Sequence, residues 1–403
     1  MNKVILHCDL NCFYASVEML YNPKLRNVPM AIAGDPKYRH GIILAKNVLA
    51  KKTGVKTAQT INDALKVCPN LVIRKPNYEL YEHYSKKVRD LYYQYTDRIE
   101  PFGQDECWLD ISESINYFGG VEKIVEELLF RVKDELGLTL SIGVSNNKIY
   151  AKLASDLALE DNYKIINSIQ DIQDMPANSL LFVGKNINET LKTYGIYTIG
   201  ELANKPISFL EKILGKFGMT LHNYANGIDD SDVCRFDEIS DEVKSIGNSM
   251  TTIRDITNID DFKIVLTTLC DYVSSRLKKK GLYYKTVHLN LRNNKLKIKT
   301  MQLSLKENSN LKKDIYNSAL QLFEINNCNF NIPYRSIGVS VSNLSSEKEI
   351  CQVDLFDDNS YSLKDLKKEQ AIELIKDRFG SDAISSLRLL EEDNLIHLKK
   401  NDG

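Results

Sequence analysis

The segment from Pro101 to Ser112, PFGQDECWLDIS, constrains the fold of this chain more than any other part of the sequence. Its apolar residues on either side of Gly103 are typical of two short strands joined by a tight turn. The adjacent carboxylates Asp105 and Glu106 follow that turn. Acidic pairs are common on solvated loops, so a surface turn is one interpretation. Two like charges at the end of a buried hairpin are costly, however, unless a cation binds there.

A third carboxylate, Asp9, ends the apolar run VILHC near the N-terminus in the same way. Three carboxylates at separate strand ends can bind two divalent cations through oxygen, and Mg²⁺ suits such a site when phosphates and water complete its coordination. Two cations in this arrangement stabilise the attacking and the leaving oxygen of a phosphoryl displacement. The spacing therefore predicts a metal site, with solvated surface carboxylates as the alternative.

The length and the composition describe an ordinary globular protein. The chain has 403 residues, of which 43% are hydrophobic and 27% charged, and a chain of this length is expected to form about two to four domains. It has no long apolar run and no signal-like N-terminus, so we expect no membrane association. The eight cysteines are scattered without a CxxC pair, which predicts reduced thiols and a cytoplasmic location.

The charge is distributed unevenly along the chain. The net charge is −1, but residues 244–341 contain 16 Lys and Arg against 7 Asp and Glu, a balance of +9 that leaves −10 for the rest. A basic domain beside an acidic remainder favours a polyanionic partner for that domain. A solvated basic face is the alternative.

The N-terminal half alternates strand-like and helix-like segments and predicts an α/β unit. We expect helices from about residue 78 to 97 and from about 121 to 136, followed by the strand LTLSIGVS and the helix NKIYAKLASDLA. From about residue 168 the pattern changes to short helices separated by glycines. There, FVGK at 182–185 is similar to the turn of a helix-hairpin-helix, whose backbone N–H groups suit a phosphate. A plain helix connection is the alternative.

The basic region from about residue 244 predicts two strand pairs and two helices, a small α+β domain with Lys and Arg on one face of its sheet. The last sixty residues contain an exposed-looking segment, CQVDLFDDNS, and then an amphipathic helix from about residue 362 to 379.

Three motifs carry a resemblance to a known family: CDLNCFYASVE at 8–18, QDECWLD at 104–110 and SIGVSNNKIYAKLASD at 141–156. Their order and spacing resemble the Y-family translesion DNA polymerases, and among these the bacterial DNA polymerase IV group. The resemblance implies a multidomain right-hand polymerase, part α/β and part α+β. Its implied parts are a palm (1–10 and 77–167), fingers (11–76), a helical thumb (168–240), an α+β little finger (244–343) and a C-terminal tail (344–403).

The resemblance also implies a catalytic site with two Mg²⁺ ions, or Mn²⁺ in their place. Asp9, Asp105 and Glu106 correspond to the family's metal-binding catalytic carboxylates, and Leu10 to the residue whose backbone carbonyl assists them. The residues implied to bind the incoming nucleotide are Phe13, Tyr14, Lys46 and Lys51. Among these, Tyr14 corresponds to the steric gate, whose flat ring leaves no room for a ribose 2′-hydroxyl.

Further residues are implied to contact partners. Those expected at the DNA backbone are Val183, Gly184, Lys185, Lys244, Ser245, Arg335 and Ser336. QVDLF resembles the peptide by which bacterial polymerases dock on the sliding clamp, with Gln352, Leu355 and Phe356 as its anchors. The alternative is that Leu355 and Phe356 pack against the C-terminal helix.

The sequence departs from the family pattern around the nucleotide. Val48 replaces a tyrosine and Lys51 an arginine that usually contact the triphosphate, and lysine lacks the bidentate fork of arginine. Leu159 and Glu160 replace the common Lys-Pro. Lys46 could compensate, or could be an ordinary solvated lysine.

Two further departures lie beside the carboxylates. Gly103 and Gln104 stand where the family usually has a serine and an aliphatic residue, which alters the approach to the metal site. Cys12 replaces a bulkier residue ahead of the gate.

These observations predict a monomeric, low-fidelity DNA-templated DNA polymerase that extends a primer 3′-OH with dNTP and has no proofreading domain. One alternative is a non-catalytic DNA-binding accessory protein with the same fold, which the departures at Val48, Leu159 and Glu160 would favour and the intact carboxylates oppose. The other is an enzyme acting on free nucleotides, such as a cyclase, which would not need a basic C-terminal domain.

Overall fold

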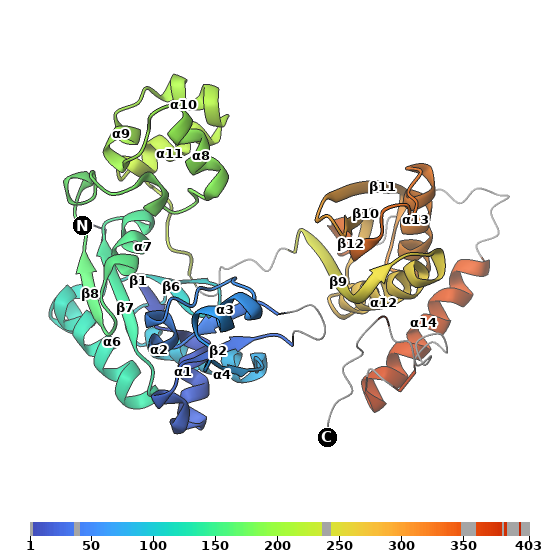
Figure 1. Ribbon diagram of the computed structural model, residues 1–403, viewed down its shortest axis with the longest axis horizontal. Helices are drawn as coiled ribbons and strands as arrows, with labels where there is room; N and C mark the ends of the chain where they lie inside the picture. Colours follow the sequence, from blue (N-terminus) through green and yellow to red (C-terminus); the bar gives the residue numbers. More distant parts are fainter. Residues whose placement is uncertain are drawn as a thin grey trace. The chain divides into compact units, whose positions relative to one another are not determined.

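The computed structural model describes residues 3–35, 41–235, 243–347 and 360–380, together with residues 383, 384 and 395. They form two compact units, one built from residues 3–34 and 41–235 and the other from residue 243 onward (Figure 1). Among the described helices, none combines the length and the apolar character needed to cross a bilayer.

The first unit is organised around a five-stranded sheet. Its strand order is β5 (Ile99–Phe102), β6 (Glu106–Asp110), β1 (Ile5–Leu10), β7 (Leu140–Ser145) and β8 (Asn162–Ile165). All neighbours are antiparallel except β7 and β8, which are parallel. The predicted hairpin around residues 101–112 is therefore confirmed as β5 and β6, and it lies beside β1.

Side chains of β1 alternate between the two faces of this sheet. Leu6, Cys8 and Leu10 pack against α1 (Phe13–Tyr21), α4 (Tyr78–Tyr92) and α6 (Val121–Leu136). Ile5 contributes to a cluster with Ala151 of α7 (Lys148–Leu157), so His7 and Asp9 face α7. Helix α7 approaches β7 closely at Gly143, where a Cβ atom would lie 1.9 Å from the Ala151 carbonyl oxygen.

A smaller sheet and several helices complete the first unit. The smaller sheet contains β3 (Ile43–Lys46), β2 (Met30–Ala33) and β4 (Val72–Arg74), packed with α2 (Val48–Lys52) and α3 (Ile61–Val67). The short α5 (Ile115–Phe118) precedes α6. A helical region follows β8, formed by α8 (Lys185–Thr193), α9 (Ile199–Ala203), α10 (Ile207–Leu214) and α11 (Phe217–Ala225). Its core includes Ile149, Tyr150 and Leu153 of α7, so α7 joins the helical region to the main sheet.

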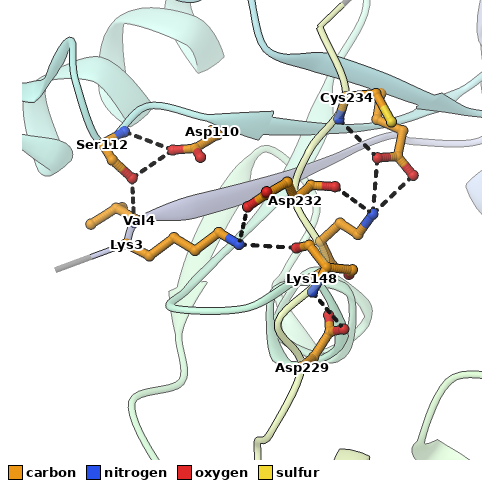
Figure 2. Close-up of polar contacts among 10 residues, drawn as sticks. Lys3, Val4, Asp110, Ser112, Lys148, Asp229, Asp232 and Cys234 are labelled. Atoms are coloured by element: carbon orange, nitrogen blue, oxygen red, sulfur yellow. Dashed lines mark hydrogen bonds and ion pairs between the residues drawn. The ribbon is translucent and has the colours of Figure 1, made fainter. Parts of the chain in front are cut away.

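After α11 the chain returns to the main sheet. Val233 is fully buried against Ile5, Trp108 and Ala151. Figure 2 shows the polar contacts of this returning segment. Lys148 Nζ donates to both oxygens of Glu100 at 3.0 and 2.9 Å and to the Asp232 carbonyl at 3.1 Å.

The second unit has a four-stranded sheet with two helices on one face. In chain order its elements are β9 (Ser245–Ile256), α12 (Ile259–Lys279), β10 (Tyr283–Asn293), β11 (Ile298–Ser309), α13 (Lys312–Ile325) and β12 (Tyr334–Ser345). The strand order is β11-β10-β12-β9. The core lies between the sheet and α12 and α13, as expected for a small α+β domain.

A further helix, α14 (Ser360–Phe379), has nearly the bounds of the amphipathic helix expected from about residue 362 to 379, but its apolar residues do not gather on one face. Its Glu369 pairs with Lys278 and accepts a bond from the Lys312 backbone N–H. Leu374 and Phe379 are exposed.

Candidate metal and nucleotide site

Three carboxylates gather at one end of the main sheet, as the sequence predicts. Asp9 on β1 is the cross-strand partner of Glu106 on β6. Asp105 lies in the turn before β6, and its carbonyl oxygen accepts a hydrogen bond from the Leu10 N–H at 3.0 Å. Asp9 and Glu106 keep 27% and 21% of their side-chain surface exposed, so both can be reached from solvent.

A lysine that the sequence analysis did not single out lies among these carboxylates. Lys152 Nζ lies 3.4 Å from Asp9, 3.1 Å from Glu106 and 2.9 Å from Asp156. Its side chain is only 10% exposed. Since Asp105 adds a further negative charge, one ammonium does not neutralise the group, and the site keeps an excess of negative charge.

The pKa values of the carboxylates reflect their burial first and then this excess of negative charge. Burial, and then the neighbouring carboxylates of Glu106 and Asp105, raise the pKa of Asp9 to about 7, although Lys152 acts in the opposite direction. Burial and the Glu106 charge also raise the pKa of Asp105. Burial acts to raise the pKa of Glu106 as well, but the nearby His7 ring and the charge of Lys152 lower it overall. A bound cation would remove the cost of ionising Asp9 and Asp105.

His7 is a second residue that the sequence analysis missed. It is fully buried beneath the site; its Nδ1 lies 2.7 Å from Ser155 Oγ, and its Nε2 lies 3.4 Å from Glu106 Oε2. Glu106 Oε2 is itself buried and has no well-aligned hydrogen bond among the described residues. This oxygen lies in an ion pair with Lys152, whose Nζ is 3.1 Å away.

The residues fit a magnesium site that is completed by substrate. The His, Cys, Asp and Glu side chains of the described ranges form no group of three that would enclose an ion by itself. Mg²⁺ commonly takes one or two protein carboxylates, with substrate phosphates and water as its other ligands. Asp9 and Glu106, with Asp105 beside them, suit that kind of coordination.

Two aromatic residues begin α1, just after the strand that carries Asp9. Phe13, expected at the nucleotide, is buried in the core of the main sheet, where its side chain packs the fold. Tyr14 is only partly buried, and its ring stacks on Tyr81 of α4 with centroids 4.2 Å apart. Burial, the Asp105 carboxylate and Tyr78 raise the pKa of Tyr14, so its hydroxyl is protonated at neutral pH and can donate a hydrogen bond.

The two lysines expected at the triphosphate lie near Cys12. Burial lowers the pKa of Lys46, and the charge of Lys51 adds to this effect. Lys46 Nζ donates to Thr57 Oγ1 at 3.0 Å, whereas Lys51 on α2 is exposed. Leu159 is 75% exposed, and its uncharged side chain does not replace the lysine that is usual at this position.

The residues expected at DNA lie in different environments. In the helical region, the Val183 side chain is buried in the core, Gly184 directly precedes α8, and Lys185 is exposed. Val183 can therefore contact DNA only through its backbone. In the second unit, Lys244 and Ser245 are exposed at the start of β9, and Arg335 and Ser336 on β12 are partly buried.

The prediction that Lys and Arg share one face of the second sheet is wrong, because Arg292 and Lys299 lie on opposite faces. The face of the second sheet turned away from the helices carries Asn290 and Arg292 on β10, opposite Gly338 and Ser336 of β12. The lysines at 295, 297 and 299 instead gather in and beside the turn between β10 and β11. Side chains of a strand alternate between the two faces of the sheet, and in β11 the odd-numbered residues lie on the core side. These three lysines are odd-numbered, so they reach solvent only at the ends of the strands. Gln352, Leu355 and Phe356 lie outside the described residues.

Comparisons with known proteins agree with this geometry. The impB/mucB/samB family matches residues 8–156, its C-terminal domain matches residues 243–355, and the DNA polymerase-iota thumb domain matches residues 173–229. DNA polymerase IV of Acetivibrio thermocellus is 41% identical over 98% of this chain and 99% of its own length. DNA polymerase IV of Alkaliphilus oremlandii is 35% identical over 97% of this chain and 100% of its own length.

A solved structure shows the same fold. A Y-family DNA polymerase chimera of Dbh and Dpo4 aligns with a TM-score of 0.72 at 21% identity, covering 84% of this chain and 98% of the chimera. This similarity shows the fold, and the family follows from the family matches, which span most of the sequence, and from the two full-length relatives. The chain belongs to the Y-family of translesion DNA polymerases, within the DNA polymerase IV group.

Proposed function

We propose that Asp9, Asp105 and Glu106 form the metal-binding catalytic site for DNA-templated addition of dNTP to a primer 3′-OH. The observation that carries this proposal is the pairing of Asp9 with Glu106 across β1 and β6, with Asp105 in the adjoining turn. Because both β1 and β6 lie inside the sheet, they hold the carboxylates in a fixed arrangement. The backbone carbonyl of Leu10 lies at the end of β1, next to Asp9.

Two divalent cations, Mg²⁺ or Mn²⁺, would supply charge stabilisation for the attacking and leaving oxygens and the departing pyrophosphate. The protein side chains position the reactants around them. Lys46 and Lys51, from β3 and α2, supply positive charge for the triphosphate in place of the usual tyrosine and arginine. Fixed positions and preorganised charge account for most of the rate enhancement in such reactions.

Tyr14 is the sugar-discriminating residue in this proposal. It lies on α1, its ring is stacked on Tyr81, and its pKa responds to the Asp105 charge. A ring held beside the metal site occupies the volume that a ribose 2′-hydroxyl would need, whereas a deoxyribose leaves that volume empty.

Primed DNA is the second substrate, and its contacts are proposed to be independent of sequence. In the helical region these are the backbone at Val183 and Gly184 and the exposed ammonium of Lys185. In the second unit they lie at the two strand segments that contain Lys244 and Arg335.

The sliding clamp is a proposed partner through the QVDLF segment. The position of this segment in the chain supports the proposal, because QVDLF falls between the end of β12 at Ser345 and the start of α14 at Ser360. We also propose a monomer in the cytoplasm. The described cysteines are free thiols, as expected in a reducing compartment.

Primer extension by Asp105→Ala and Glu106→Ala variants tests the catalytic proposal. Both should lose extension in Mg²⁺, while their affinity for primed DNA stays within about threefold of wild type, because the carboxylates bind metal and not the duplex. Exposed Glu122→Ala on α6 is a matched control and should extend normally. Normal extension by either carboxylate variant would refute the metal assignment. Binding of primed DNA without extension by the wild-type protein under any metal condition would favour the accessory-protein alternative.

A further inference from the structure

Gln104 makes a contact that the usual aliphatic residue at this position could not make. Its side-chain Oε1 accepts a hydrogen bond from the Tyr14 hydroxyl at 2.9 Å. The two residues come from separate elements, Tyr14 from α1 and Gln104 from the turn between β5 and β6. The hydrogen bond therefore joins the proposed gate to the turn that contains Asp105 and leads into Glu106 at the start of β6.

The backbone of Gln104 is itself held in place. Ser85 Oγ on α4 donates a hydrogen bond to the Gln104 carbonyl, and Arg89 Nη1 donates to Ser85 Oγ at 2.7 Å. The preceding Gly103 has φ of 88°, a conformation that favours glycine. It lets the turn present the Gln104 side chain to Tyr14. The acceptor is thus positioned by the hairpin turn and by α4 together.

The ring of Tyr14 is supported in two directions. Tyr81 is fully buried and stacks on one face of the ring at an interplanar angle of 12°. Tyr81 is fixed by its own hydroxyl, which donates to Glu18 Oε1 at 2.9 Å. Stacking resists motion along the ring normal but permits sliding within the ring plane, and the bond to Gln104 opposes that sliding.

We propose that Gln104 is a positioning residue for Tyr14 and thereby helps to determine the selectivity for deoxyribonucleotides over ribonucleotides. The inference rests on the proposed role of Tyr14 as the gate. A 2′-hydroxyl can enter only if the ring gives way, and the ring then has to break its bond to Gln104. The loss of one net hydrogen bond predicts a fall in selectivity of about threefold to tenfold.

The test compares selectivity, measured as kcat/KM for dNTP divided by kcat/KM for rNTP, in a set of variants. Gln104→Met keeps the length of the side chain but removes the acceptor, and Tyr14→Phe keeps the ring but removes the donor. Gln94→Met makes the same change at an exposed position after α4 and serves as the control. Thermal melting of each variant shows whether it is folded.

Each single variant should lower selectivity about threefold to tenfold, and the double variant should lower it no further than either one, because both remove the same bond. Gln94→Met should match wild type. A purely structural role for Gln104 would lower the melting temperature and the two kcat/KM values alike, leaving their ratio unchanged, and that result would overturn the inference.

Tyr14→Ala separates the inference from the proposal on which it rests. If this variant accepts rNTP freely but Gln104→Met and Tyr14→Phe keep the wild-type ratio, the gate stands and the positioning role of Gln104 is wrong. If Tyr14→Ala itself keeps the wild-type ratio, the gate assignment is wrong, and the inference fails with it. If the selectivity losses of Gln104→Met and Tyr14→Phe add up in the double variant, the two residues act independently, and the positioning role of Gln104 is overturned.

Discussion

Replacement of Asp9 by asparagine should stabilise the metal-free protein while abolishing its response to metal. Asp9 has a pKa raised to about 7, mainly by burial and then by neighbouring carboxylates. Each pKa unit corresponds to about 1.4 kcal/mol, so a shift from 3.8 to about 7 means that ionised Asp9 costs the fold at most about 4 kcal/mol. This value already includes the attraction to Lys152. Because 27% of the Asp9 side chain is exposed, solvent screening reduces the cost, and we expect a gain of about 2 kcal/mol in the free energy of unfolding.

The sign of the pH dependence follows from the direction of the shift. A carboxyl group with a raised folded-state pKa disfavours folding progressively as pH rises from its unfolded value to about 7. Asparagine is neutral throughout, so its advantage over aspartate should be largest at pH 8 and should shrink towards pH 5.

The assay is thermal melting in a chelating buffer, with and without added Mn²⁺. At pH 8 a gain of about 2 kcal/mol corresponds to a rise of about 4–8 °C for a unit of this size. Added Mn²⁺ should raise the melting temperature of wild type and leave Asp9→Asn unchanged. Exposed Asp90→Asn on α4 removes a carboxylate elsewhere and should match wild type in both respects. A metal-free Asp9→Asn protein that melts at or below the wild-type temperature would refute the reasoning.

Three further predictions concern other parts of the chain. Lys148→Met should lower the stability of the first unit by about 1–2 kcal/mol in urea unfolding, since it removes the charged donor to Glu100. An unchanged unfolding midpoint would show that this ion pair does not stabilise the unit. The double replacement of Lys46 and Lys51 by alanine should raise the apparent KM for dNTP, and normal nucleotide kinetics would show that the triphosphate is held elsewhere. Alanine at Leu355 and Phe356 should leave unassisted extension intact but remove stimulation by a loaded clamp, whereas lowered thermal stability with intact stimulation would favour packing.

The sequence predicted the elements that strong local patterns define. The hairpin around Gly103 was predicted, and so was the helix from Val121 to Leu136. The helix from Tyr78 was predicted to reach Asp97 but ends at Tyr92, where single turns replace it. Helix ends depend on such local hydrogen bonds, which an apolar pattern does not reveal.

The sequence motifs predicted the carboxylates of the site but not the side chains that surround them. The three carboxylates follow from strand ends, but the places of Lys152 and His7 follow from which face of β1 meets α7. That face is decided by the order of strands in the sheet, and sheet order depends on contacts far apart in sequence. The spacing of Lys152 and Asp156 within an apolar helix was the available signal for the ion pair.

The central claim is that Asp9, Asp105 and Glu106 hold the catalytic metal ions. Its most direct test is the number of Mn²⁺ ions bound in a complex with incoming dNTP and a primer that lacks its 3′-OH, measured by electron paramagnetic resonance. Wild type should bind about two ions per chain, and Asp9→Asn and Glu106→Gln should each bind fewer with weaker affinity. Two tightly bound ions in both variants would contradict the claim.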